Sequence, residues 1–109
     1  MPILKGQSRK KLIAGPGKSD SPKYVLRLFI SGISQNSVRA AKNLNRICEE
    51  FIKGNYQLEI IDIYQQPDLA VGEQVIVIPV LIIKHPLPEK RIIGDLSNQE
   101  KVLETLHCK

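Results

Sequence analysis

The longest apolar stretch of the chain is Val75–Ile83, and it is interrupted by a single proline, Pro79. A run this rich in β-branched residues predicts a buried strand, but proline has no N–H to donate to a sheet ladder. Two arrangements resolve the conflict. Either the strand starts at a trans Pro79, which the local sequence favours, or a cis Ile78–Pro79 bond enters the strand at a turn. In both cases Pro79 has a structural role at the entry of a strand.

Alternation and helical spacing predict the elements before this run. Tyr24–Ile30 and Tyr56–Ile63 are rich in strand-forming residues and predict two strands. Between them, Ser34 is a candidate helix N-cap. Apolar residues then recur at the three- and four-residue steps of one helix face: Val38, Ala41, Leu44, Cys48 and Phe51. Strand, helix and strand in this order predict a right-handed βαβ unit with parallel strands.

The second half of the chain predicts a short helix, two strands and a last helix. Proline and aspartate in Gln66–Asp68 are typical of a helix start. Lys90–Gly94 predicts a short strand, and Ser97–Glu100 forms a capping box that predicts a helix starting at Ser97. The predicted order is β-α-β-α-β-β-α, within one α/β domain covering residues 23–109.

Charge separates this domain from the N-terminal residues. Of the formal net charge of +5, residues 1–23 carry six basic residues against Asp20 alone, and the rest of the chain is balanced. Interleaved glycine, proline and serine predict that residues 1–22 form a flexible basic extension. A nucleic-acid or lipid binder acting through this extension is one alternative function. The aromatic residues form no RNA-binding signature, however, so we do not expect nucleic acid as a partner.

Neither a membrane nor a cofactor is expected. No uncharged apolar run approaches the ~20 residues needed to cross a bilayer, and residues 1–11 lack a stretch of signal-peptide length. We therefore expect a soluble, cytoplasmic protein. Its two cysteines, Cys48 and Cys108, form neither a C-x-x-C motif nor a metal-ligand pair, and Cys48 falls on the apolar helix face.

The element order, with Pro79 at the entry of a strand, resembles the thioredoxin-like fold. Oxidoreductases of that fold carry a nucleophilic cysteine at the start of the first helix, where the helix dipole lowers the pKa of the thiol. This position reads Ser34-Gln35-Asn36-Ser37, with serines in place of cysteines. A hydroxyl has no accessible anion near neutral pH, so we expect no dithiol exchange and no enzyme. A glutathione-using serine enzyme is the enzymatic alternative, and nothing near these serines in sequence favours it.

Several motifs together resemble the KaiB family of circadian clock proteins. They are Tyr24–Gly32, Asn36–Ala40, Lys53–Tyr56, Ile61–Asp62, Pro67–Ala70, Pro79–Leu81, Arg91–Asn98 and Glu100–Leu103. The block that begins at Arg91 is the most specific, and the resemblance extends from about Lys23 to Leu106.

The resemblance implies a non-enzymatic protein that binds a hexameric KaiC-type ATPase and modulates its phosphorylation cycle. KaiA, or a histidine kinase with a KaiB-like domain, is the further partner implied. It also implies self-association as a tetramer or dimer, and two folds: a thioredoxin-like form and a tetrameric resting form with the second half rearranged. We expect charged residues to contact the partner: Arg39, Lys42, Lys84, Lys90, Arg91 and Asp95. Pro79, Gly94 and Ser97 are expected to have structural roles. A thioredoxin-like adaptor in another signalling or stress pathway is the alternative.

The chain departs from the family pattern at several positions. Glu59 stands where the family usually has a basic residue, and Thr105 and His107 replace its glycine and aspartate. We therefore expect a divergent KaiB homologue. The charge reversal at Glu59, on a strand expected to bind a partner, predicts a different choice of partner or weaker binding.

Overall fold

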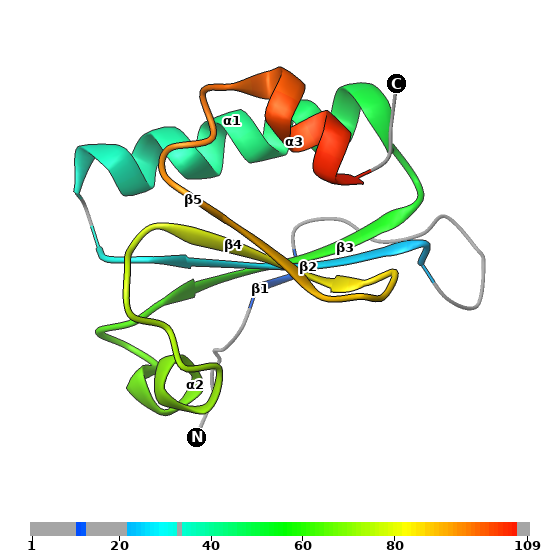
Figure 1. Cartoon of the computed structure of the whole chain (residues 1–109). Helices are drawn as coiled ribbons and strands as arrows, with labels where there is room; N and C mark the ends of the chain where they lie inside the picture. The colour runs from blue at the N-terminus through cyan, green and yellow to red at the C-terminus, as the bar shows by residue number, and fades with distance from the viewer. Residues whose placement is uncertain (1–10, 13–21, 33, 107–109) are drawn as a thin grey trace.

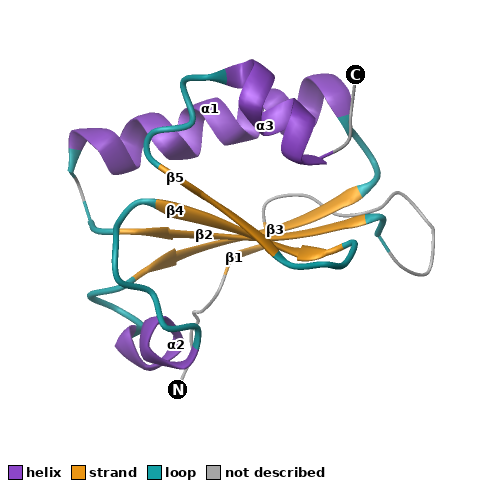
Figure 2. Ribbon diagram, in the orientation of Figure 1, coloured by secondary structure: helices purple, strands orange, loops and turns teal. Residues whose placement is uncertain are grey.

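The structure, a computed structural model, describes residues 11–12, 22–32 and 34–106. Its elements in chain order are β1 (Lys11–Leu12), β2 (Tyr24–Ile30), α1 (Gln35–Phe51), β3 (Tyr56–Asp62), α2 (Pro67–Gly72), β4 (Val80–His85), β5 (Lys90–Ile93) and α3 (Gln99–Leu106). The strands form one five-stranded sheet in the order β1-β3-β2-β4-β5. Helices α1 and α3 lie together on one face of this sheet, and α2 lies on the other (Figures 1 and 2). None of the described helices is long and apolar enough to cross a membrane.

The strand pairing confirms the predicted thioredoxin-like order from β2 to α3. β2 and β3 run parallel with Tyr24 opposite Tyr56, as expected for a βαβ unit. β4 runs antiparallel to both β2 and β5. The sequence pattern did not predict β1, which falls within the extension expected to be flexible and pairs antiparallel with β3. The other residues of that extension lie outside the described part of the chain, except for Pro22.

Pro79 immediately precedes β4, and the Ile78–Pro79 peptide bond is cis. The trans arrangement that the local sequence favoured is therefore wrong. The strand ladder begins one residue later, at Val80, so the missing N–H of the proline is not needed. The Pro79 carbonyl accepts a hydrogen bond of 3.0 Å from the Gly94 N–H. Gly94 has a φ of +116°, which a residue with a side chain rarely adopts.

Helix α1 packs against the sheet through a face slightly rotated from the predicted one. Its buried residues are Ser37, Ala40, Leu44, Ile47 and Cys48. The predicted position Val38 is 43% exposed, whereas Ala40 and Ile47 are fully buried. Three- and four-residue spacing fits more than one stripe of a helix, and contact with the sheet selects the stripe centred on Leu44. The N-cap prediction is confirmed, because the Ser34 side chain accepts from the Ser37 N–H.

Helix α3 begins at Gln99, so the predicted start at Ser97 is wrong by two residues. The Asn98 Oδ1 accepts from the Lys101 N–H at 3.1 Å, which makes Asn98 the capping residue. The Ser97 N–H instead donates to Asp95 Oδ1 at 3.0 Å in the turn before the helix. Asparagine caps helices as well as serine does, so the adjacent residue could take the role.

Candidate partner-binding surface

The start of α1, where a thioredoxin-like enzyme would carry its thiol, is stabilised by serine hydroxyls. Ser34 Oγ accepts from the Ser37 N–H at 3.2 Å, and Ser37 Oγ accepts from the Ser31 N–H at 2.9 Å. Ser37 is fully buried. Both hydroxyls therefore satisfy backbone groups of the turn and the first helical residues.

The cysteine of the described region, Cys48, belongs to the hydrophobic core. Cys48 is fully buried in α1, and burial raises the pKa of its thiol to about 12. Such a thiol is not a nucleophile at neutral pH. Within residues 11–12, 22–32 and 34–106, no cluster of three histidine, cysteine or acidic side chains could hold a metal ion.

Two of the six predicted contact residues form a pair beside α1. Arg39 Nε lies 3.3 Å from Asp95 Oδ2, and Asn43 Nδ2 donates to the Asp95 carbonyl at 2.8 Å. Hydrogen bonds from Ser97 and, after them, the interaction with Arg39 lower the pKa of the Asp95 carboxyl. Lys42 lies exposed on the same helix. Arg39 and Asn43 thus hold the turn before α3 against α1.

Two other predicted residues, Lys84 and Arg91, lie on the opposite face of the sheet. Lys84 Nζ is 2.9 Å from Glu73 Oε2 and 3.2 Å from Glu89 Oε1. Arg91 Nη2 donates to the Glu73 carbonyl at 2.6 Å and to Glu89 Oε2 at 3.3 Å. The hydrogen bond with Glu73 raises the pKa of Lys84. Lys90 begins β5. The structure therefore does not bring the six predicted residues into one group.

Glu59 lies on the same face of the sheet as Lys84, Arg91 and Glu73, and its surroundings correct an expectation from sequence. It was expected on a polar strand face that binds a partner, but its side chain is only 9% exposed and lies 2.8 Å from Arg27 Nε. Arg27 also contacts Glu73 Oε2 at 3.1 Å. The negative charge at Glu59 is thus compensated within the chain, so it does not by itself predict a change of partner.

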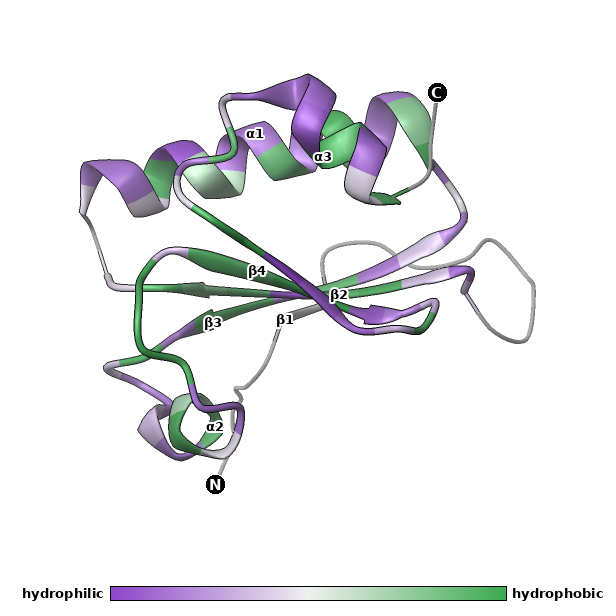
Figure 3. Cartoon of the chain, in the orientation of Figure 1, coloured by the Kyte–Doolittle hydropathy of each residue, from purple (hydrophilic) through white to green (hydrophobic). Residues whose placement is uncertain are grey.

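An exposed apolar patch, which charge-based reasoning missed, lies beside Arg91. It consists of Ile76, Val77 and Ile93, which are 90%, 46% and 62% exposed. The loop that carries Ile76 and Val77 follows α2 and is strongly hydrophobic (Figure 3). An open groove of about 250 Å³ runs between this loop and β5. The sequence run Val75–Ile83 was expected to form a buried strand, and the structure contradicts this at Ile76 and Val77.

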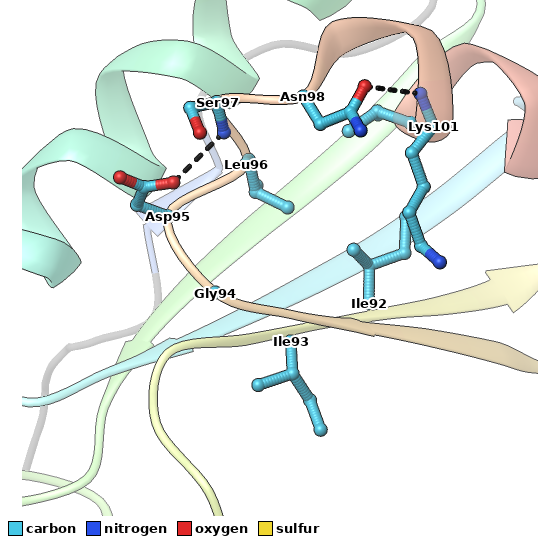
Figure 4. A pocket seen from close by; sticks show the side chains of 9 residues that line it. Ile92, Ile93, Gly94, Asp95, Leu96, Ser97, Asn98 and Lys101 are labelled. Carbon is cyan, nitrogen blue, oxygen red and sulfur yellow. Dashed lines mark hydrogen bonds between the residues drawn. The ribbon is translucent and has the colours of Figure 1, made fainter.

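A smaller hollow of about 120 Å³ lies at the start of α3 (Figure 4). Its polar groups bond to one another: the Ser97 N–H to Asp95, and the Lys101 N–H to Asn98. Ile92 and Ile93 lie side by side in β5 but point to opposite faces of the sheet (Figure 4). Ile92 joins the core under α1 and α3, which leaves Ile93 for the apolar patch.

These features define a small thioredoxin-like domain with serines at the corner where oxidoreductases carry thiols. Solved structures confirm the fold. Chloroplastic thioredoxin z superposes with a TM-score of 0.64 at 19% identity, covering 78% of this chain and 79% of that one. The N-terminal domain of SasA from Synechococcus elongatus superposes with a TM-score of 0.57 at 26% identity, covering 84% and 90%.

The KaiB domain family matches residues 27–108, and the chain belongs to this family. The circadian clock oscillator protein KaiB of Thermostichus vulcanus is 50% identical over 80 residues, covering 73% of this chain and 74% of the relative. The circadian clock protein KaiB3 of Synechocystis sp. is 49% identical over 84 residues, covering 77% and 82%. The resemblance inferred from the sequence motifs is confirmed.

Proposed function

We propose that this chain is a non-enzymatic clock protein that binds a hexameric KaiC-type ATPase and modulates its phosphorylation cycle in the cytoplasm. The observation that carries the proposal is the 50% and 49% identity to two proteins named as circadian clock proteins. The start of α1 supports a binding role, because Ser34 and Ser37 are engaged in backbone hydrogen bonds.

The apolar patch is the surface on which we place the partner. Exposed aliphatic side chains that adjoin one another are typical of protein interfaces, and arginine is enriched there. Arg91 adjoins the patch and is held by the Glu73 carbonyl and the Glu89 carboxylate. A side chain that is already held in place loses less conformational entropy when a partner binds. Lys84, on the neighbouring strand β4, lies on the same face as Arg91, whereas Lys90 lies opposite Ile83 and faces the other side of the sheet.

The remaining predicted contacts, Arg39, Lys42 and Asp95, lie on the side of the sheet that α1 covers. A partner seated on the apolar patch reaches them by extending around the edge strand β5. We propose them as secondary contacts, which contribute to specificity more than to affinity because exposed charges are screened by salt.

We also propose that the second half of the chain can rearrange into a resting, tetrameric form. Helix α2 supports this, because none of its residues, all of which are described, is fully buried. Elements with few buried apolar contacts open at low free-energy cost. KaiA, or a histidine kinase with a KaiB-like domain, is the proposed further partner. The likeness to the SasA N-terminal domain supports a further partner with a related domain.

The test is equilibrium binding of the full chain to purified KaiC-type ATPases, with Ile76→Glu as the variant. Ile76 is 90% exposed, so the substitution leaves the fold intact while placing a charge in the patch. Leu87→Glu is the matched control, since Leu87 is 74% exposed in the loop between β4 and β5. We expect Ile76→Glu to weaken binding at least tenfold and Leu87→Glu less than twofold. The absence of a complex with every ATPase tested, or equal effects of the two variants, would overturn the proposal.

A further inference from the structure

Helix α2 and the loop that follows it form a separate layer on the face of the sheet opposite α1 and α3 (Figures 1 and 3). The strands beneath this layer contribute four buried apolar side chains: Phe29, Ile61, Val80 and Ile82. The side chains that cover them, from α2 and its flanking segments, are only partly buried: Ile63, Leu69, Ala70, Val75 and Ile78. A second, small apolar core is thus closed by a thin cover.

The sequence of α2 gives this cover little stability of its own. The helix has six residues, none of them buried, and no side chain caps its N-terminus at Gln66. Its last residue is Gly72, and glycine is among the residues least favourable in a helix. A Cβ at this position would meet no atom within 4 Å. The glycine therefore weakens the helix without a steric reason.

The C-terminus of α2 forms a Schellman motif in which glutamine occupies the usual glycine position. The Val75 N–H donates to the Ala70 carbonyl at 2.9 Å, and the Gln74 N–H donates to the Val71 carbonyl at 3.0 Å. The residue at the position of Gln74 takes a left-handed conformation in this motif and is usually glycine. Gln74 has a φ of +58°, which is unfavourable for a residue with a side chain. The glycine of this segment lies two residues before the position where it would relieve that strain.

The polar contacts that fasten the end of α2 to the sheet converge on Glu73. Its carboxylate lies 3.1 Å from Arg27 Nη1 in β2 and 2.9 Å from Lys84 Nζ in β4. Its carbonyl accepts from Arg91 Nη2 in β5 at 2.6 Å. Beyond Glu73, the backbone groups of residues 76–78 form no hydrogen bond with another backbone group of the described residues. Glu73 is therefore placed to act as a latch.

The groove beside the apolar patch is built from both this layer and the sheet. Residues 74–77 line it from the layer, whereas Val80, Arg91 and Ile93 line it from the sheet. Movement of the layer away from the sheet would remove one wall of the groove and release Arg91 from the Glu73 carbonyl. The groove therefore exists only while the layer is closed.

We propose that residues 67–78 form a lid, latched by Glu73, which opens locally while the strands of the sheet stay paired. We further propose that docking at the apolar patch requires the closed lid. A segment with few buried apolar contacts opens at lower free energy than the core strands. A partner that binds only the closed lid shifts the population toward it. The lid is inferred from α2 and its contacts alone, whereas its coupling to a partner rests on the proposed function.

The first test measures amide exchange of Leu69, Glu73 and Val75, whose N–H groups are hydrogen-bonded within the lid. In the unmodified full chain, we expect these amides to exchange at least tenfold faster than residues 81–83 of β4. Gly72→Ala and Gln74→Gly should each slow lid exchange about threefold, and the double variant about tenfold. Gln74→Val should accelerate it at least threefold, because a β-branched residue tolerates a left-handed backbone poorly.

The control for these variants is Lys53→Gly, in the turn after α1. Lys53 is exposed and is not among the residues with a positive φ. We expect this variant to leave lid exchange unchanged, and all variants to leave β4 unchanged. The lid would be overturned by equal exchange of lid and β4 in the unmodified chain. It would also be overturned by lid rates that do not rise in the order glycine, glutamine, valine at position 74.

The second test repeats the measurement on the full chain saturated with a KaiC-type ATPase. Leu69 and Glu73 do not line the groove, so a contact confined to the groove would leave their exchange unchanged. Docking that requires the closed lid should slow their exchange at least tenfold, whereas residues 44–51 of α1 should keep their rates. Protection confined to residues 74–77 would overturn the coupling. If no ATPase tested forms a complex, the proposed function and the coupling both fail, and the variants at Gly72 and Gln74 still decide the lid.

Discussion

Replacing Glu73 by glutamine should loosen the loop that carries the apolar patch. Glu73 directly follows α2 and precedes Ile76 by three residues. Its carboxylate lies 3.1 Å from Arg27 Nη1 and 2.9 Å from Lys84 Nζ. Its carbonyl accepts from Arg91 at 2.6 Å. One residue thus joins the loop to β2, β4 and β5.

The size of the effect follows from how far these side chains are buried. The side chains of Arg27, Glu73 and Lys84 are 25%, 16% and 32% exposed. Their ion pairs are therefore less exposed than typical surface pairs and more exposed than a fully buried pair. Exposed pairs contribute about 0–1 kcal/mol, and breaking a buried pair costs about 3–5 kcal/mol. Arg27 keeps Glu59 and Lys84 keeps Glu89, so no cation is left unpaired. We therefore expect Glu73→Gln to destabilise the fold by about 1–2 kcal/mol.

Urea denaturation followed by circular dichroism measures this difference. Glu50→Gln is the control, because the Arg46–Glu50 pair is 3.9 Å long and its side chains are 46% and 54% exposed. The control should change the free energy of unfolding by less than about 0.5 kcal/mol. Amide exchange in α2 and residues 73–78 should accelerate in Glu73→Gln before global unfolding. If Glu73→Gln is indistinguishable from the control, the cluster does not hold the loop and the reasoning is refuted.

Two further predictions concern groups of the helical layer. In a Cys108→Ser variant, Cys48 should resist Ellman's reagent in the native state and react after unfolding, because burial raises its pKa to about 12; rapid native labelling would contradict the packing of α1. The pKa of Asp95, measured by NMR titration, should rise more in Ser97→Ala than in Arg39→Gln, because the hydrogen bond from the Ser97 side chain, which alanine removes, is the largest cause of the lowered pKa. Ionised Asp95 then stabilises the fold at neutral pH, and this contribution is lost as the pH falls through its folded-state pKa. A larger rise of the Asp95 pKa in Arg39→Gln than in Ser97→Ala would disprove the assigned order of causes.

The elements that local sequence specifies could be predicted closely. The strand Tyr24–Ile30 has the predicted limits, and Ser34 caps α1 as expected. A run of strand-forming residues and a capping side chain are local features, so they can be read without the tertiary structure. The buried face of α1 was predicted with an error at Val38. The three- and four-residue spacing of apolar residues predicts that a helix has an apolar face. Contact with the sheet decides which face is buried.

The candidate site was less accessible from sequence, for two reasons. Arg27 meets Glu59 and Glu73 across separations of 32 and 46 residues, and no local pattern reports such pairing. Ile76 was assigned to a buried strand because a binding surface and a core share one composition. The signal that was present is Pro79, which precedes the first residue of β4 and separates the exposed Ile76 and Val77 from that strand.

Amide exchange of the full chain, alone and saturated with a KaiC-type ATPase, tests the central claim most directly. A docking domain with its contact at the apolar patch predicts slower exchange in residues 74–77 and at Ile93 and Gly94 in the complex. The turn from Ser34 to Ser37, which only caps α1, should exchange at the same rate in both states. A complex in which residues 74–77 are unaffected and the Ser34–Ser37 turn becomes protected would contradict the account.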